Sequence, residues 1–210
     1  MTAEDAPFQF PEQFFRRLDP SPDRFFYDTP RFVNHIDDAT IAALTALYAE
    51  MIPPGSRVLD LMSSWVSHLP ADREYGRVTG LGMNAEELKA NGQLTEWTVQ
   101  DLNERPVLPY EDASFDVATC AVSVQYLTRP LEVFREVGRV LSPGGVFAVS
   151  FSHRTFPEKA IEAWRTMPAA DLVRLVAAYF AISGPFGEPI FLDRSPEGAD
   201  PLWCVVGRRE

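Results

Sequence analysis

The residues best suited to chemistry lie within or directly after apolar runs of the sequence. Asp60 interrupts the run 57–62, and Asp101 comes directly after the segment 96–100. A carboxylate at the end of a strand accepts hydrogen bonds either from a polar ligand or from the backbone of a turn. His68, Tyr126 and His153 are the candidate bases for a reaction that removes a proton from a hydroxyl or an amine. A lone histidine is also common as a structural residue, so both interpretations of the histidines stay open.

Other active-site chemistries lack their residue patterns. The three scattered histidines, with Cys120 and Cys204 in separate apolar stretches, do not have the spacing of a metal site or a disulfide framework. Ser64 and Ser67 near His68 lack the Gly-x-Ser-x-Gly frame of a hydrolase nucleophile. The Gly-x-Gly-x-x-Gly turn is absent after the first strand-like run, which makes an NAD-dependent dehydrogenase the weaker hypothesis.

The elements that would position these residues alternate along the chain from Asp37 onward. Apolar and β-branched runs predict strands at 57–62, 78–82, 96–100, 115–122 and 146–151. Helical spacing predicts helices at 37–51, 85–90, 131–145, 158–167 and 169–180, and two further strand candidates at 189–192 and 202–207 suggest a closing hairpin. This alternation predicts an α/β fold with a doubly wound, mainly parallel sheet. Ligands then bind at the carboxyl ends of the strands, where the strand order reverses.

The first 36 residues are set apart by their prolines and phenylalanines. Prolines at 7, 11, 20, 22 and 30 prevent one long helix, whereas phenylalanines at 8, 10, 14, 15, 25 and 26 favour burial. We therefore expect residues 1–36 to form an arm packed on a single domain at 37–210. Whether the arm only packs or also closes over a ligand stays open.

The composition is that of a globular chain with an acidic balance. The 210 residues are enough for about one domain, and 46% of them are hydrophobic. A net charge of −11 without a basic run disfavours a nucleic-acid partner. No apolar run is long enough for a membrane span, and the first ten residues lack the features of a secretory signal. We expect a cytoplasmic protein with a small-molecule substrate and no membrane partner. The sequence does not indicate its oligomeric state.

Two motifs in the centre of the chain occur in a characteristic order. The first is Leu108-Pro109-Tyr110-Glu111-Asp112-Ala113-Ser114-Phe115-Asp116, and the second ends in Arg139-Val140-Leu141-Ser142-Pro143-Gly144-Gly145. Over 57–207 the chain resembles the class I S-adenosylmethionine-dependent methyltransferases of the ubiquinone/menaquinone-biosynthesis type, known as methyltransferase type 11. The end of the chain, 200–207, is similar to that family's last antiparallel strand. The resemblance implies a Rossmann-like fold with a C-terminal antiparallel strand, and S-adenosyl-L-methionine as the cofactor.

The resemblance also implies roles for individual residues. Asp60 matches the acid that helps to hold the methionine end of the cofactor, and Asp101 matches the acid that accepts from the adenine amine. Residues 122–125 match the floor of the site, where the methyl acceptor also arrives. The implied cofactor-binding set is Asp60, Met62, Ser64, Gly82, Met83, Asn84, Asp101, Leu102, Val122 and Gln125.

Two departures from the family pattern fall within this set. The family's Asp-x-Gly-x-Gly-x-Gly reads Asp60-Leu61-Met62-Ser63-Ser64-Trp65-Val66 here. Because glycine lets the backbone approach a ligand, we expect this loop to reshape the pocket, to weaken cofactor binding and to use dihedrals that other residues tolerate. Gly82 stands where the family has the acid for the ribose. Asn84 is the candidate substitute through its amide, without the strength of a charge-assisted hydrogen bond.

These features predict an S-adenosylmethionine-dependent methyltransferase that acts on an unidentified small molecule. The rival hypothesis is a non-catalytic binding or regulatory protein that kept the methyltransferase fold and lost the glycine loop. Binding of the cofactor or of its demethylated product separates the two.

Overall fold

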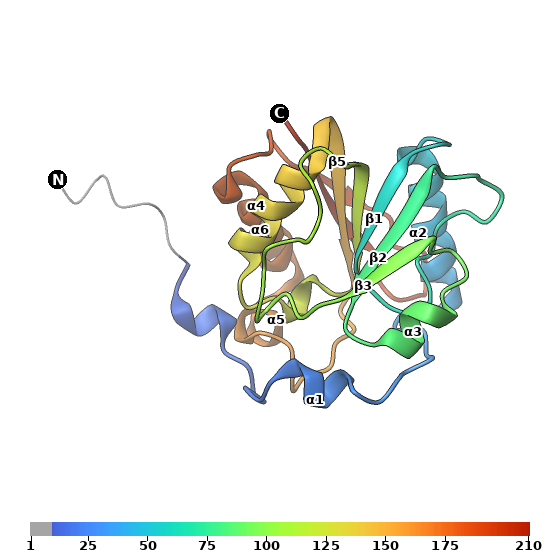
Figure 1. The fold of residues 1–210 in the computed structure, drawn as a ribbon. Helices are drawn as coiled ribbons and strands as arrows, with labels where there is room; N and C mark the ends of the chain where they lie inside the picture. The colour runs from blue at the N-terminus through green and yellow to red at the C-terminus, as the bar shows by residue number, and fades with distance from the viewer. Residues whose placement is uncertain (1–9) are drawn as a thin grey trace.

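A seven-stranded sheet forms the centre of the molecule (Figure 1). The computed structural model describes residues 10–210, so the expectations for Pro7 and Phe8 lie outside the described residues. The strand order is β3-β2-β1-β4-β5-β7-β6; β1 to β5 run parallel, and β7 is antiparallel to both of its neighbours. This confirms the Rossmann-like, mainly parallel sheet with a C-terminal antiparallel strand. The strands are β1 (Arg57–Ser63), β2 (Arg77–Gly82), β3 (Glu96–Val99), β4 (Phe115–Ala121), β5 (Leu141–Phe151), β6 (Ile190–Asp193) and β7 (Trp203–Arg208).

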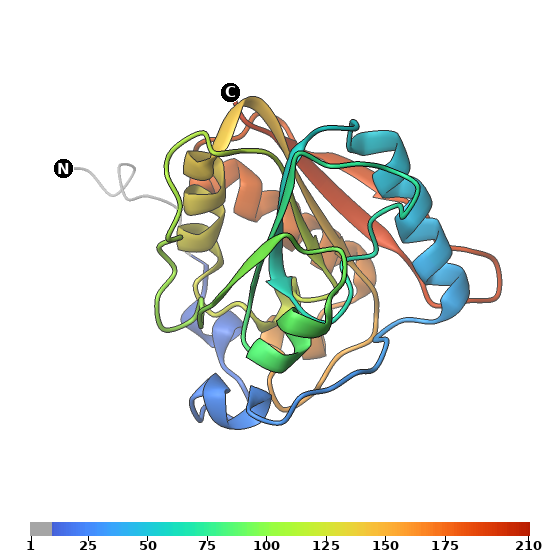
Figure 2. The ribbon, with the colours of Figure 1, turned by 45° about the vertical axis from the view of Figure 1, so that its right-hand side comes forward.

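Helices cover both faces of this sheet (Figure 2). Buried side chains of α4 and α6 pack with Leu59 and Leu61 in one core cluster, whereas α2 packs with Val58 in the other. Successive residues of β1 therefore face opposite sides, as the period of a strand requires. The helical elements are η1 (Glu12–Phe15), α1 (Asp23–Tyr27), α2 (Asp38–Met51), α3 (Ala85–Ala90), η2 (Val124–Tyr126), α4 (Pro130–Val140), α5 (Glu162–Thr166) and α6 (Ala169–Ser183). None of the helices in 10–210 has the length and apolarity that crossing a membrane requires.

Local signals explain where the helices begin. The Asp37 carboxylate accepts a hydrogen bond from the Thr40 amide at 2.9 Å and caps α2. Asn84 caps α3 in the same way, because its side-chain oxygen accepts from the amides of Glu86 and Glu87. The predicted bounds of α3 agree with the structure.

Two predicted helices are shorter in the structure. We expected one helix to end at 143–145, but α4 ends at Val140 because Leu141 already pairs with Phe115 at the start of β5. The helix expected at 158–167 is limited to α5. Its earlier part is a turn, because the Ile161 amide donates to the Gln125 carbonyl at 3.0 Å instead of continuing a helical ladder.

The strand order reverses between β1 and β4. From β1 the chain adds β2 and β3 outward on one side, and then crosses to β4 on the other side. Such a switch point leaves a crevice at the carboxyl ends of the two strands. Figure 1 shows η1 and α1 at the same end of the molecule as α3 and α5.

Candidate functional site

A pocket opens at the carboxyl ends of β1, β2 and β4. Residues 100–103, which come after β3, and the arm complete its wall. Most of the candidate residues from the sequence line it: Asp60, Met62, Ser64, His68, Gly82, Met83, Asn84, Asp101, Leu102, Val122 and Tyr126. Residues separated by more than 60 positions thus meet in one cavity, as the switch point predicts.

Gln125 and His153 were also predicted for this site, and neither is among the residues that line the pocket. Gln125 is fully buried beneath the floor, where its amide donates to the Val122 carbonyl at 2.9 Å. The His153 ring instead lies 3.4 Å from Asp200, outside the pocket. His153 follows β5, which lies one strand further from the switch point than β4.

The end of β1 contains a left-handed residue that is not glycine. Met62 has a φ of 56° and forms a bulge, so that Leu61 pairs with Leu81 but Ser63 pairs with Gly82. The expectation of ordinary dihedrals is wrong at Met62, because left-handed φ costs an L-residue roughly 1 to 2 kcal/mol. The bulge also explains Gly82: a Cβ there would overlap the backbone carbonyl oxygen of Ser63. An acid for a ribose has no room at this position.

The stability of loop variants tests the strain assigned to Met62 at the bulge. Met62→Gly is expected to be more stable than Met62→Ala by about 1 kcal/mol, because both lose the side chain and only alanine keeps the left-handed strain. At Ser64, which has no positive φ, the order should reverse by about 0.5 to 1 kcal/mol because glycine has more freedom in the unfolded chain. Urea unfolding of the four variants measures both differences. The same order at both positions would contradict the assigned strain.

Backbone strain gathers around the pocket. Of the four non-glycine residues with positive φ in 10–210, Met62, His68 and Val122 line it, and Val122 is β-branched, which makes its φ of 49° an outlier. The Val122 amide donates to Ser150 at 2.8 Å and holds this conformation. Strained residues persist where the surrounding structure fixes them, and they cluster at ligand sites.

Asp60 is a buried carboxylate without a cationic partner in the described chain. Its oxygens accept from the hydroxyls of Ser63 at 2.5 Å, Ser67 at 2.7 Å and Thr119 at 3.3 Å. Burial nevertheless raises the pKa of Asp60 to about 6, because the hydroxyls only partly replace water. Asp60 is thus a buried acceptor whose charge a cationic ligand group would stabilise.

The raised pKa of Asp60 predicts a pH dependence of stability. The folded protein holds this proton more tightly than the unfolded chain, whose aspartate has a pKa near ~4. The free energy of unfolding should therefore fall as pH rises from about 4 to about 6. Asp60→Asn is expected to remove this part of the slope and to raise the free energy of unfolding at pH 7 by about 2 kcal/mol. Urea unfolding at a series of pH values checks it, and an unchanged difference between the two proteins from pH 4 to 7 would contradict it.

The two carboxylate oxygens of Asp101 differ in their hydrogen bonds. Oδ1 accepts from the amides of Asn103 at 2.8 Å and Glu104 at 3.4 Å, and Oδ2 has no hydrogen-bond partner among residues 10–210. Burial is the largest cause that raises the pKa of Asp101, and Asp23 adds to it. Leu102, which is buried, lies beside it in the pocket wall. This pair offers an acceptor next to an apolar surface.

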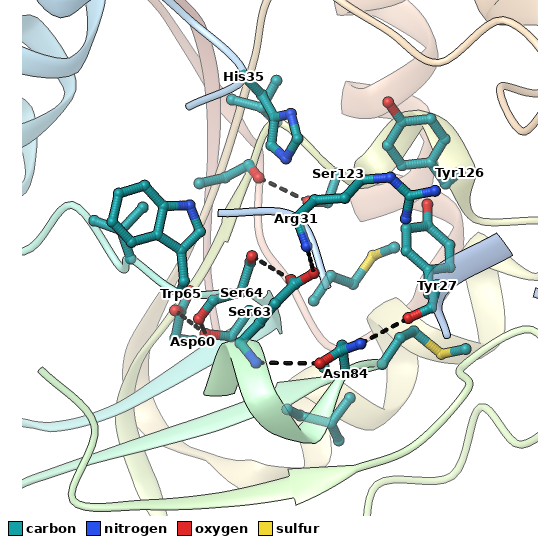
Figure 3. Close-up of a pocket in the computed structure, with 18 of the residues that line it drawn as sticks. Tyr27, Arg31, His35, Asp60, Ser63, Ser64, Trp65, Asn84, Ser123 and Tyr126 are labelled. Atoms are coloured by element: carbon teal, nitrogen blue, oxygen red, sulfur yellow. Dashed lines mark hydrogen bonds between the residues drawn. The ribbon is translucent and has the colours of Figure 1, made fainter. Parts of the chain in front are cut away.

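Asn84 uses its amide on the arm. Its nitrogen donates to the carbonyls of Tyr27 at 2.9 Å and Asp28 at 3.1 Å, while its oxygen caps α3. Both amide hydrogens are therefore engaged in this structure, and Figure 3 shows the bond to Tyr27. The predicted contact of this amide with a ligand hydroxyl would have to replace an arm contact.

Glu87 is a pocket acid that the sequence analysis missed. It is 8% exposed, and its carboxylate accepts from the Arg31 amide at 2.6 Å and from the Ser64 hydroxyl at 2.5 Å. Glu87 thereby links the arm to the loop after β1. Its place on α3, one turn after the cap Asn84, is the only signal in the sequence, and it does not point to a pocket.

The arm supplies a wall that was also missed in detail. Tyr27, Arg31 and His35 line the pocket, and Trp65 of the loop donates from its ring nitrogen to the Val33 carbonyl at 3.0 Å. The proline and phenylalanine pattern predicts a packed arm, but nothing in that pattern indicates which of its residues face the pocket.

The two candidate bases in the pocket differ in protonation. Burial lowers the pKa of His68 to about 4, and its Nδ1 is a buried atom without a hydrogen-bond partner in the described chain. Burial raises the pKa of Tyr126, whose hydroxyl accepts from the Phe156 amide at 2.9 Å. At neutral pH His68 is therefore a neutral acceptor and Tyr126 a protonated phenol.

Comparison with known proteins agrees with this geometry. Residues 63–149 match a family model described as a methyltransferase domain. The ubiquinone/menaquinone biosynthesis C-methyltransferase UbiE of Ruegeria sp. is 34% identical over 64 residues, which are 30% of this chain and 24% of that protein. The central part of the chain is therefore similar to the class I S-adenosylmethionine-dependent methyltransferase family.

Two further relatives define the extent of the likeness. The biotin biosynthesis bifunctional protein BioHC of Teredinibacter turnerae is 32% identical over 130 residues, 60% of this chain and 20% of that protein. The chain thus spans about a fifth to a quarter of the length of these two curated relatives. The S-adenosylmethionine dependent methyltransferase of Mesorhizobium loti shares the fold with a TM-score of 0.56 at 19% identity, covering 80% of this chain and 98% of that one.

Proposed function

We propose that this protein binds S-adenosyl-L-methionine in the pocket and transfers its methyl group to a small molecule. The observation that carries the proposal is the meeting of Asp60 and Asp101 at the carboxyl edge of a sheet of this family. Their separate surroundings support separate tasks. Asp60 lies buried near the switch point, and Asp101 lies beside the apolar Leu102.

The residues present fit such a cofactor. Asp60 would face the ammonium of the methionine end, Asp101 Oδ2 would accept from the adenine amine, and Leu102 would contact the ring. Val122, Met62, Ser64 and Met83 would form the surrounding wall. The unpartnered Nδ1 of His68 is a further polar atom that a ligand could satisfy.

When bound, the cofactor supplies an electrophilic methyl group, so the chain itself has to align the acceptor and exclude water. The arm, with Tyr27 and His35 in the pocket wall, would provide the exclusion. For an acceptor with a hydroxyl or an amine, His68 is the residue best placed to take the proton. It is neutral at physiological pH and already lines the pocket.

Binding of S-adenosylhomocysteine to Asp101 variants tests the proposal. Asp101→Asn keeps an oxygen for the Asn103 amide but removes the second acceptor, and we expect a loss of about 1 to 3 kcal/mol in binding with little change in stability. Asp72→Asn, at an exposed position, is the matched control. Isothermal titration measures both. Full affinity in folded Asp101→Asn would make Asp101 a turn residue only, and no heat at millimolar ligand with the unaltered protein would favour the non-catalytic alternative.

A further inference from the structure

Arg31 is the one Lys or Arg among the described residues that line the pocket. Its backbone amide donates to Glu87, but its guanidinium makes a different set of contacts. Nη1 donates weakly to the Thr29 carbonyl at 3.4 Å, and within 10–210 no carboxylate lies within ion-pairing distance of the guanidinium. Most of its five N–H donors therefore have no protein acceptor.

Aromatic rings surround this guanidinium. Its central carbon lies 4.3 Å from the ring centre of Phe26, 5.7 Å from that of Phe156 and 5.9 Å from that of Tyr27. Figure 3 shows the side chain reaching from the arm across the pocket toward Tyr27. A guanidinium that stacks on rings with its face keeps its N–H groups in its own plane, available at its edge. That edge is a fork that matches the two oxygens of a carboxylate.

The other charged residues of the pocket are acids, which makes the Arg31 guanidinium important for binding an anion. Asp60, Glu87 and Asp101 line the same cavity and repel anions, so an anionic group can enter only beside a cation. His35 does not provide one at neutral pH, because partial burial and the charge of Arg31 lower its pKa against the opposing effect of Glu87.

We propose that Arg31 is the anion-binding residue of this pocket and that its ligand is a carboxylate, held by the guanidinium edge between aromatic walls. The carboxylate has two possible sources, the amino-acid end of the adenosyl cofactor or the methyl acceptor itself. The first source rests on the proposed function; the presence of the anion site does not. In the second case the acceptor is a planar, aromatic acid, because Tyr27 and Phe156, which line the pocket beside Arg31, are aromatic.

Three probes distinguish the sources: S-adenosylhomocysteine, 5′-methylthioadenosine, which lacks the amino-acid end, and benzoate. Each is titrated against the unaltered protein, Arg31→Met and the control Arg24→Met. Arg24 belongs to the same arm, stacks on Phe25 at 4.8 Å and pairs with Glu104 in solvent, outside the pocket. The Arg31 backbone contact with Glu87 remains in the variant, and thermal unfolding confirms that it is folded.

Loss of a charge-assisted hydrogen bond should weaken the carboxylate ligand about 10- to 100-fold in Arg31→Met and leave Arg24→Met unchanged. A loss for S-adenosylhomocysteine but not for 5′-methylthioadenosine assigns the carboxylate to the cofactor. A loss confined to benzoate assigns it to the acceptor. Unchanged affinities for all three probes, or equal losses for both adenosyl ligands without a loss for benzoate, overturn the proposal. If the unaltered protein binds benzoate through Arg31 but no adenosyl ligand, the proposed function fails and the anion site stands.

Discussion

Replacing Lys159 with methionine is expected to lower the free energy of unfolding by about 3 to 5 kcal/mol, the usual cost of leaving a buried charge without its partner. Lys159 is completely buried, and its ammonium lies 2.8 Å from the Asp19 carboxylate and 3.3 Å from that of Asp23. It also donates to the Ser21 carbonyl at 2.8 Å. Asp23 is itself 4% exposed, so the variant leaves a buried acid with less positive charge around it. Lys159 therefore joins the arm to the segment before α5.

This change should also weaken ligand binding, because the segment that Lys159 holds leads into Tyr27 and Arg31 of the pocket wall. Lys89→Met, which alters the other lysine of the chain at an exposed position on α3, is the control and should change neither property. Urea unfolding and titration with S-adenosylhomocysteine give the two results. A stable Lys159→Met protein with full affinity would mean that the arm is held mainly by its aromatic contacts.

Gly82→Asp, which would restore the family's acid after β2, is expected to destabilise the protein by about 3 kcal/mol or more and not to improve cofactor binding. The new Cβ would overlap the Ser63 carbonyl oxygen and lie 3.1 Å from Leu88. Both carbonyl and glycine belong to paired strands, so neither can move without loss of the β1–β2 ladder. The altered loop and the missing acid are thus two aspects of one local structure.

Gly92→Asp is the matched control for this change, because nothing lies within 4 Å of a Cβ at Gly92. It should differ from the unaltered protein by less than ~1 kcal/mol. Thermal or urea unfolding compares the two variants, and titration with S-adenosylhomocysteine reports on the site. A stable Gly82→Asp protein with tighter binding would show that the loop can move away, and that the site had lost an acid it can still accommodate.

Sequence patterns were sufficient for the elements and their order. The run at 57–62 and the stripe of valines at 133, 137 and 140 reflect burial on each face of a sheet or one face of a helix, and this information is local. The alternation of such runs then restricts the topology to a few arrangements. The ends of elements were harder to predict where a hydrogen bond from a distant part of the chain sets them. An example is the bond between Ile161 and Gln125 before α5.

Two acids of the site were predictable for the same reason. Asp60 lies near the end of β1 and Asp101 follows β3, and the carboxyl ends of parallel strands meet at one edge, so their place in a shared pocket follows from local pattern and fold. His153 also follows a strand, yet it lies outside the pocket beside Asp200, because β5 is one strand further from the switch point than β4. A position at the end of a strand is therefore not sufficient to predict that a residue lines this pocket.

The sequence by itself determined the fold, the switch point and the two aspartates, because burial and strand pattern are written in neighbouring residues. Tertiary structure alone decided three features of the site. These are the positive φ of Met62, the exclusion of a side chain at Gly82, and the hydrogen bonds that Glu87 accepts from Arg31 and Ser64. Each of these depends on atoms that come within contact distance only after distant segments have packed. Residue type and spacing carry no record of such distances.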